Sequence, residues 1–232
     1  MRTLGLIGGL SWESTAIYYR HLNEMARERL GGLHSAKLVL WSFDFADVAR
    51  LQHGNDWAGA TALMEDAARS VAAAGAEAIV ICTNTMHMMA DAVEKASGRP
   101  VLHIVDAAAA ALQAAKAKRP LLLATRYTME QPFYRDRLTR HGIEAVVPDE
   151  ADRALVHRVI YEELCRGVVN PSSRVAVANV IMANAARQAI DSVILGCTEI
   201  TMLIGPGDTP LPVFDTTRLH AESALTFALG ED

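Results

Sequence analysis

Short runs rich in Val, Ile and Leu alternate along this chain with longer, Ala-rich stretches in which polar residues recur at helical spacing. Apolar runs of about four to eight residues, bounded by Gly or polar turns, are typical of strands buried on both faces. Strands that alternate with helices predict parallel β-sheets covered by helices on both sides. We therefore expect an α/β protein.

The pattern predicts the order of the elements. In the first half of the chain, strands are expected over residues 3–8, 36–42, 77–82 and 101–106. Helices are expected to end near residues 30 and 96 and to cover residues 57–74 and 107–116, with 43–56 as a loop. In the second half, strands are expected over 121–125, 143–147 and 192–197, and helices over 133–138, about 149–166, 172–188 and from about 216.

The two halves resemble each other. The segment LGLIGGLSWES, followed by YYR, is echoed by LLLATRYTMEQPFYR, which begins at Leu121. This repeat predicts two similar lobes related by a pseudo-twofold axis, with a site in the cleft between them. We expect residues 1–115 to form the first lobe, with a C-terminal helix at about 213–232 packing back on it, and residues 116–212 to form the second.

Composition narrows the possible functions. The 232 residues are 51% hydrophobic and 21% charged with a net charge of −5, which argues against nucleic-acid binding because that needs a basic face. No apolar run reaches the roughly 18 residues of a membrane span, and the N-terminus lacks a signal-peptide cleavage pattern. The three cysteines are an odd number and show no zinc-binding spacing, which indicates reduced thiols, a cytoplasmic protein and no metal.

Cys82 and Cys197 are the most informative residues. Each ends an apolar run, each is followed by Thr, and they are separated by about half of the chain. Open parallel sheets bind ligands beyond the carboxyl ends of their strands, where helix N-termini favour anions. A lone cysteine at a strand end is commonly a small buried hydrophobe, but the repeated Cys-Thr context favours a pair of functional thiols facing a small anion. Cys165 shares neither context and is interpreted as a helix residue.

The chain resembles the aspartate/glutamate racemase family over essentially its whole length. The resemblance is carried by LGLIGGLSWEST, CTNTMH, ATRYTMEQ, GCTEI and VFDTT. It implies a cofactor-independent amino-acid racemase, most similar to those acting on aspartate or glutamate, that works as a homodimer on a small amino acid. Related arylmalonate decarboxylases, maleate isomerases and hydantoin racemases share the fold; the decarboxylases use one cysteine of the pair, whereas this chain has both.

The resemblance assigns chemistry to the cysteines. Racemisation removes the α-proton from one face of the substrate and returns a proton to the other, so Cys82 and Cys197 are expected to exchange the roles of base and acid. A free thiol has a pKa of about 8.5, which suits either role. Neither pyridoxal phosphate nor a metal is expected.

Further side chains are expected to bind the substrate or to tune the thiols. Hydroxyl and amide groups at the strand ends are candidates for the α-carboxylate, with helix capping as the alternative role: Ser11, Thr83, Asn84, Thr85, Thr125, Thr128 and Thr198. By resemblance, Gln52 and Arg166 are expected to bind the distal group, where relatives commonly carry Lys in place of Arg166. Glu199 and His87 are candidates for tuning the thiols.

Two other functions stay open from the sequence. One is a lyase or isomerase that acts on a small dicarboxylate through a single thiol. The other is a non-catalytic binding or sensing protein whose thiols respond to oxidation. A single-thiol lyase or isomerase should keep its activity when one of the two cysteines is replaced, whereas a racemase should not. A binding or sensing protein should not exchange the α-hydrogen of its ligand, whereas a racemase should.

Overall fold

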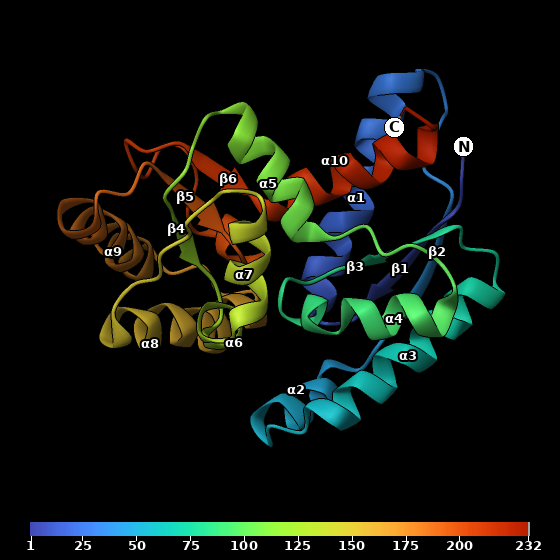
Figure 1. The fold of residues 1–232 in the computed structure, drawn as a ribbon, viewed down its shortest axis with the longest axis horizontal. Helices are drawn as coiled ribbons and strands as arrows, with labels where there is room; N and C mark the ends of the chain where they lie inside the picture. Colours follow the sequence, from blue (N-terminus) through green and yellow to red (C-terminus); the bar gives the residue numbers. More distant parts are fainter. Residues whose placement is uncertain (232) are drawn as a thin grey trace. The chain divides into compact units, whose positions relative to one another are not determined.

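The computed structural model describes residues 1–231, which divide into two compact units. Unit 1 contains Met1–Ile104 together with the C-terminal residues from His220, and unit 2 contains Val105–Leu219 (Figure 1). Each unit is built on one three-stranded sheet. The α/β class with two parallel sheets flanked by helices, expected from the hydrophobic pattern, is confirmed.

Unit 1 is organised around a sheet in the order β2-β1-β3, with all pairs parallel. Its strands are β1 (Leu4–Gly8), β2 (Leu38–Ser42) and β3 (Ala78–Ile81). All residues of β1 and β3 are buried, as expected for strands covered on both faces. Because side chains alternate along a strand, Leu6 faces one side of this sheet and Ile7 the other.

Helices cover both faces of this sheet. Helices α1 and α10 pack on the face of Leu6, and α3 and α4 pack on the face of Ile7 (Figure 1). The helical segments are α1 (Trp12–Leu30), α2 (Phe45–His53), α3 (Trp57–Ala73), a 3-10 helix (Thr85–Met89), α4 (Ala90–Ser97) and α10 (Thr216–Leu229). The two apolar faces of the sheet therefore form two separate cores.

Unit 2 has a sheet in the order β4-β5-β6, again parallel throughout. Its strands are β4 (Pro120–Leu123), β5 (Ser192–Leu195) and β6 (Val213–Asp215). Its helical segments are α5 (Ile104–Ala114), α6 (Arg126–Glu130), α7 (Pro132–Arg140), α8 (Glu150–Arg158), a π-helix (Val159–Glu163), two 3-10 helices (Leu164–Arg166 and Glu199–Met202) and α9 (Pro171–Gln188).

Several expected elements are wrong. The strands expected over 101–106 and 143–147 are each reduced to one bridging residue, Val101 against Ile79 and Val146 against Leu121. Residues 43–56 are not a loop but contain α2, whose first turn is capped by the Asp44 carboxylate accepting from the Ala46 N–H at 3.0 Å. The single helix expected over 149–166 is α8 followed by a π-helix and a 3-10 helix.

The unit boundaries also differ from those expected. Residues 105–115 belong to unit 2, and β6 completes the second sheet instead of packing on the first lobe. Asp106 explains the first difference, because it accepts two hydrogen bonds from Arg137 of α7, at 2.7 and 2.6 Å. This bidentate pair holds α5 against α7.

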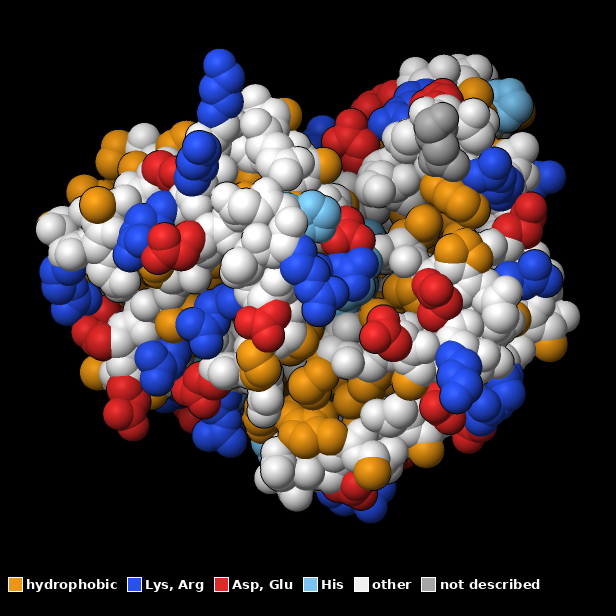
Figure 2. Space-filling view, in the orientation of Figure 1, with side chains coloured by type: hydrophobic (Ala, Val, Ile, Leu, Met, Phe, Trp, Pro, Cys, Tyr) orange, Lys and Arg blue, Asp and Glu red, His pale blue; other side chains and the backbone are white. Residues whose placement is uncertain are grey.

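No helix among residues 1–231 is long and apolar enough to cross a membrane. Lys and Arg are interspersed with Asp and Glu over the face seen in Figure 2, in line with the modest net charge of −5. The surface on this face therefore offers a mixture of charges in place of a basic stripe.

Candidate active-site residues

Cys82 directly follows β3 at the carboxyl end of the first sheet. Its backbone N–H donates to the Ile7 carbonyl at 2.9 Å, which continues the ladder to β1 for one more residue. The side chain is fully buried, and its Sγ lies 3.8 Å from the Val80 carbonyl oxygen. Burial raises the pKa of the Cys82 thiol, because the thiolate loses its hydration. Cys82 is therefore held as the neutral thiol.

The turn after Cys82 brings several predicted binding residues together. Thr83 N–H donates to the Ile81 carbonyl at 2.8 Å, and Asn84 and Thr85 are buried at the start of the 3-10 helix. Helix α2 places Gln52 beside the same segment, where its Nε2 donates to Met86 Sδ at 3.4 Å. Gln52 is thus buried against the turn that follows Cys82, although its role with a substrate stays a prediction.

His87 fixes this turn through both ring nitrogens. Its Nδ1–H donates to the Thr83 carbonyl at 2.7 Å, and its Nε2 accepts from the Ile104 N–H at 3.2 Å. Burial lowers the pKa of His87, and the neighbouring His103 and His220 lower it further, which keeps the ring neutral. We assign His87 to positioning the turn, because neither nitrogen is left to exchange a proton with Cys82.

His220 of α10 extends this network, although the sequence analysis predicted no role for it. Its Nδ1 accepts from the Tyr18 hydroxyl at 2.7 Å, and its Nε2–H donates to the Leu102 carbonyl at 2.6 Å. Burial lowers the pKa of His220 to about 4. Helices α1 and α10 are thereby hydrogen-bonded to residues 102–104, the same segment that donates to His87.

The neutral state of His220 predicts a loss of stability in acid. Its pKa is about 4 in the folded chain and about 6.5 when unfolded, so between these values only the unfolded state binds the proton. From pH 7 to pH 5, the free energy of unfolding should fall by roughly 2 kcal/mol through this group. Urea unfolding at both pH values measures the drop. His220→Gln should make the drop smaller by about 2 kcal/mol and leave the part due to the neutral His87, whereas His53→Gln at an exposed position should leave the drop unchanged. Equal pH dependence in wild type and His220→Gln would contradict the assignment.

The turn before α1 is tightly constrained. A Cβ on Gly9 would lie 2.2 Å from the Phe43 backbone nitrogen, and Gly9 has φ of +69°. Ser11 adopts φ of 113°, a strained value for a residue with a side chain, and caps α1 by accepting from the Ser14 N–H at 3.3 Å. Its hydroxyl also donates to Glu13 at 3.0 Å. The capping role expected as an alternative for Ser11 is therefore present, and substrate contact stays a prediction.

Cys197 follows β5 at the carboxyl end of the second sheet. Its Sγ–H donates to Glu199 Oε2 at 2.9 Å, and both side chains are buried. Burial raises the pKa of the Cys197 thiol, and the adjacent Glu199 carboxylate raises it further. A buried carboxylate at this distance is a ready acceptor for the thiol proton. Glu199, predicted as a tuning residue, is thus in direct contact with the thiol.

Threonines surround the Cys197 turn. Thr198 accepts a hydrogen bond from the Thr217 hydroxyl at 3.1 Å, and the Thr216 hydroxyl donates to the Leu195 carbonyl at 2.8 Å. Both Thr216 and Thr217 are fully buried, although sequence reasoning assigned them no role. Both belong to VFDTT, one of the segments that carry the family resemblance, and this was the only sign in the sequence that they could matter. These contacts fix the turn that carries Cys197.

Thr125 and Thr128 occupy the corresponding place after β4. Both are buried at the start of α6, with their hydroxyl oxygens 3.5 Å apart. The structure therefore brings these two predicted binding residues together at the carboxyl end of the second sheet. Their contact with a substrate stays a prediction.

An aromatic cluster, Tyr127, His157 and Tyr161, lies in the same unit. Tyr161 belongs to the π-helix, and its ring is 4.7 Å from that of His157 and 6.4 Å from that of Tyr127. Burial raises the pKa of the Tyr161 phenol, and charges on its neighbours, Cys197 among them, raise it further. Short π-helices are frequent at functional sites. Tyr161 is therefore a site candidate that the sequence did not reveal.

Arg166 and Cys165 lie just beyond the π-helix. Arg166 is exposed at the end of the 3-10 helix, and it forms no ion pair with any residue in 1–231. Cys165 is half-buried and packs against the core that contains Cys197. The expected role of Arg166 in binding a distal carboxylate stays a prediction. Within the described part of the chain, no three His, Cys, Asp or Glu side chains converge in a way that would hold a metal ion.

Known proteins resemble this chain over most or nearly all of its length. The crystal structure of a candidate Asp/Glu racemase from Yersinia pestis is 52% identical, with a TM-score of 0.91 over 99% of this chain and 100% of that one. An aspartate racemase homologue from Pyrococcus horikoshii is 32% identical, with a TM-score of 0.86 over the same shares of the two chains. The broad specificity amino-acid racemase RacX of Bacillus subtilis is 22% identical over 71% of this chain and 70% of its own.

The family model described as Asp/Glu/Hydantoin racemase matches residues 7–224. This match includes both cysteine turns and every residue proposed for the site. The chain belongs to the Asp/Glu/hydantoin racemase family.

Proposed function

We propose that this protein is an amino-acid racemase that inverts the α-carbon of aspartate or glutamate with Cys82 and Cys197, without pyridoxal phosphate. One observation carries the proposal. Each cysteine lies within two residues of the end of a buried parallel strand, each is buried, and each is followed by Thr and then by a 3-10 helix that begins two or three residues after the cysteine. Family membership and the names of the relatives support the reaction class.

The chemistry balances with two thiols alone. A thiolate at one cysteine takes the α-proton, which forms an S–H bond and leaves the electron pair on the α-carbon, delocalised into the carboxylate. The other cysteine donates its S–H proton to the opposite face and becomes the thiolate. The roles are thereby exchanged, so the product of one direction leaves the protein ready for the reverse reaction.

The two thiols are activated differently. Cys197 has its proton acceptor in place, because Glu199 Oε2 lies 2.9 Å from the sulfur. Within residues 1–231, the Cys82 sulfur forms no hydrogen bond to a carboxylate, and it lies 3.8 Å from the Val80 carbonyl oxygen. For Cys82, the α-ammonium of the substrate supplies the positive charge that favours the thiolate.

The strand-end turns would hold the α-carboxylate. Thr83, Thr85, Thr125, Thr128 and Thr198 bring hydroxyl groups to the carboxyl ends of the two sheets, as a carboxylate requires. Donors aimed at that carboxylate stabilise the negative charge that develops when the α-proton leaves. Ser11 and Asn84 are the other proposed ligands. We assign the distal carboxylate to Gln52 and Arg166, of which Arg166 is exposed and therefore free to pair.

Proton NMR in D₂O tests the proposal directly. Incubation with L-aspartate or L-glutamate should erase the α-proton signal, while chiral chromatography of the same sample shows the D-enantiomer accumulating toward an equal mixture. Neutral amino acids should react more slowly if the distal carboxylate is recognised. Retention of every α-proton signal across a panel of amino acids would exclude racemisation and favour a binding or sensing protein.

A further inference from the structure

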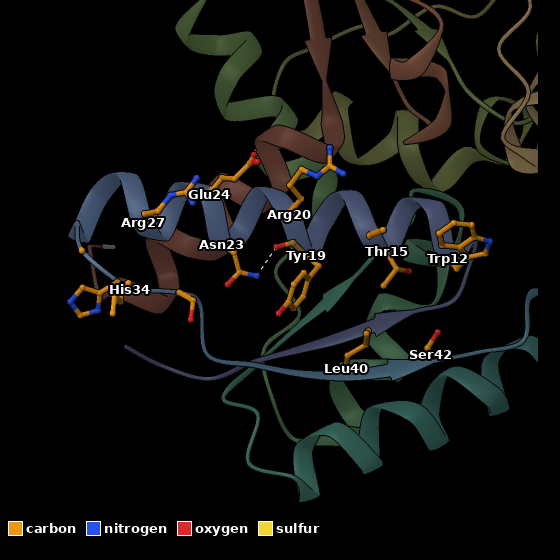
Figure 3. A pocket seen from close by; sticks show the side chains of 14 residues that line it. Trp12, Thr15, Tyr19, Arg20, Asn23, Glu24, Arg27, His34, Leu40 and Ser42 are labelled. Carbon is orange, nitrogen blue, oxygen red and sulfur yellow. Dashed lines mark hydrogen bonds between the residues drawn. The ribbon is translucent and has the colours of Figure 1, made fainter.

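The three cysteines of the chain are divided unequally between the units. Cys82 is the one cysteine of unit 1, whereas unit 2 contains both Cys165 and Cys197. A groove on the surface of unit 1, between α1, the loop after it and β2, is lined by aromatic, charged and aliphatic side chains but by no cysteine (Figure 3). Unit 2 is therefore the unit in which two thiols can react with each other.

Cys165 lies beside the turn that carries Cys197. It belongs to the 3-10 helix Leu164–Arg166, which contacts the 3-10 helix Glu199–Met202 that follows Cys197. Cys197 is a member of the hydrophobic core of unit 2, and Cys165 packs against the same core. The two thiols are therefore neighbours in the folded unit, although they are well separated in the sequence.

Electrostatic effects indicate the same proximity. Burial and the Glu199 carboxylate raise the pKa of Cys197, and the charge of Cys165 adds to this. Burial and Tyr127 raise the pKa of the Tyr161 phenol, and the charges of Cys165 and Cys197 both add to it. Because such effects weaken with distance, both sulfur atoms lie near the same phenol.

The two thiols differ in what can reach them. Cys165 is half-buried and in contact with solvent, whereas Cys197 is only 7% exposed. A small disulfide in solution therefore meets Cys165 first. Cys197 has Glu199 Oε2 at 2.9 Å as an acceptor for its proton, and a thiol that loses its proton attacks a disulfide. Cys197 is thus placed to attack a disulfide that has formed at Cys165.

The segment that carries Cys165 is able to adjust its position. It is preceded by the π-helix Val159–Glu163, so the regular hydrogen-bond pattern of α8 stops before it. It is followed by Gly167, which has φ of +72° and no atom within 4 Å of the place where a Cβ would lie. A disulfide requires Cα atoms about 4.4–6.8 Å apart, and a segment outside a regular helix can shift to reach this spacing.

We propose that Cys165 and Cys197 form a reversible disulfide, which withdraws Cys197 from the racemisation proposed above. The Cys165 thiolate attacks a low-molecular-weight disulfide such as oxidised glutathione, forming a mixed disulfide and releasing one reduced thiol. The Cys197 sulfur then attacks Cys165 Sγ, and its proton passes through Glu199 to the second thiol that leaves. The protein is oxidised by two electrons, and the small disulfide is reduced to two thiols. The loss of activity rests on the proposed function, but the disulfide itself does not.

Peptide mapping tests the disulfide without reference to activity. The protein is incubated at a series of ratios of oxidised to reduced glutathione, its remaining thiols are blocked with N-ethylmaleimide, and non-reduced tryptic peptides are identified by mass spectrometry. Trypsin places Cys82, Cys165 and Cys197 in separate peptides, residues 70–95, 159–166 and 188–218. Peptide 159–166 should be joined to 188–218 in chains that migrate singly on a non-reducing gel, and dithiothreitol should separate the two peptides and restore racemisation.

Two variants serve as controls. Cys165→Ser should lack the joined peptide and should lose activity in oxidised glutathione at least about tenfold more slowly than wild type. Cys165→Ser combined with Val175→Cys moves the second thiol of unit 2 to a position on α9 that is 60% exposed, and it should behave in the same way.

Three results would overturn the proposal. One is a wild-type protein in which Cys165 and Cys197 carry only N-ethylmaleimide or glutathione at every ratio. Another is a disulfide that joins Cys197 to Cys82 in place of Cys165. The third is a fully joined protein that keeps its racemase activity. A joined peptide in a protein that racemises no amino acid would count against the proposed function and would leave the disulfide established.

Discussion

Replacing either Cys82 or Cys197 by serine should lower racemisation of aspartate and glutamate by at least about a thousandfold in both directions. Each turnover needs a base on one face of the α-carbon and an acid on the other, and general acid–base groups contribute about 10²- to 10⁴-fold each. A hydroxyl is too weak an acid to replace the thiol. The rates are measured by chiral chromatography from both pure enantiomers.

Exchange of the α-hydrogen makes this test sharper. In Cys82→Ser, Cys197 still removes a proton from one enantiomer, so this enantiomer should exchange its α-hydrogen with D₂O without inversion, and the opposite enantiomer should do so in Cys197→Ser. Cys165→Ser should stay within a few-fold of wild type, because this residue is assigned no part in proton transfer. Near-normal racemisation by either single variant would contradict the two-thiol mechanism and favour chemistry at one thiol.

Glu199→Gln should lower kcat/KM for both enantiomers by about 10²-fold or more. The carboxylate accepts the proton of Cys197 across 2.9 Å, and an amide cannot take it. Because the equilibrium constant of a racemisation is one, the two values of kcat/KM must fall by the same factor. The rising limb of the pH–rate profile should move to lower pH, because the Glu199 carboxylate raises the pKa of the Cys197 thiol and the variant lacks that charge.

The shift of the pH profile separates this role from a purely structural one. Glu163→Gln is the matched control, because Glu163 is a half-buried carboxylate of the same unit that accepts from Ser173 at 2.8 Å. It should leave the shape of the profile unchanged. A Glu199→Gln variant with the wild-type profile would mean that the carboxylate only packs beside Cys197.

The hydrophobic pattern predicted the buried strands well. It was wrong where an apolar run pairs with a sheet through a single residue. LGLIG and AIVI pair along their whole length. VLHIVD has the same appearance, but the His87 ring accepts from the Ile104 N–H and α5 begins there, so the pairing with the sheet is limited to a single bridge at Val101. The competing partner lies 17 residues away, outside any local pattern.

The same distinction applies to the site. Cys82, Cys197 and Glu199 could be proposed from their neighbours in sequence, because strand-end context is local, and their catalytic roles stay predictions. The contacts that hold the turns are not local: Tyr18 and His220 are 202 residues apart, and His220 and Leu102 are 118 apart. Tyr161 is a site candidate because it belongs to a π-helix. The helical spacing of the sequence predicts only one continuous helix there.

The division of the chain into units has a consequence for its synthesis. Unit 2 is one continuous stretch, Val105–Leu219, inserted between the two segments that form unit 1. The first sheet leaves the ribosome early, but one of its faces is covered by Ala221, Leu225 and Ala228, and the Ala228 carbonyl accepts from the Arg2 N–H at 2.7 Å. The half translated first therefore completes its core last, after the inserted half has had time to fold.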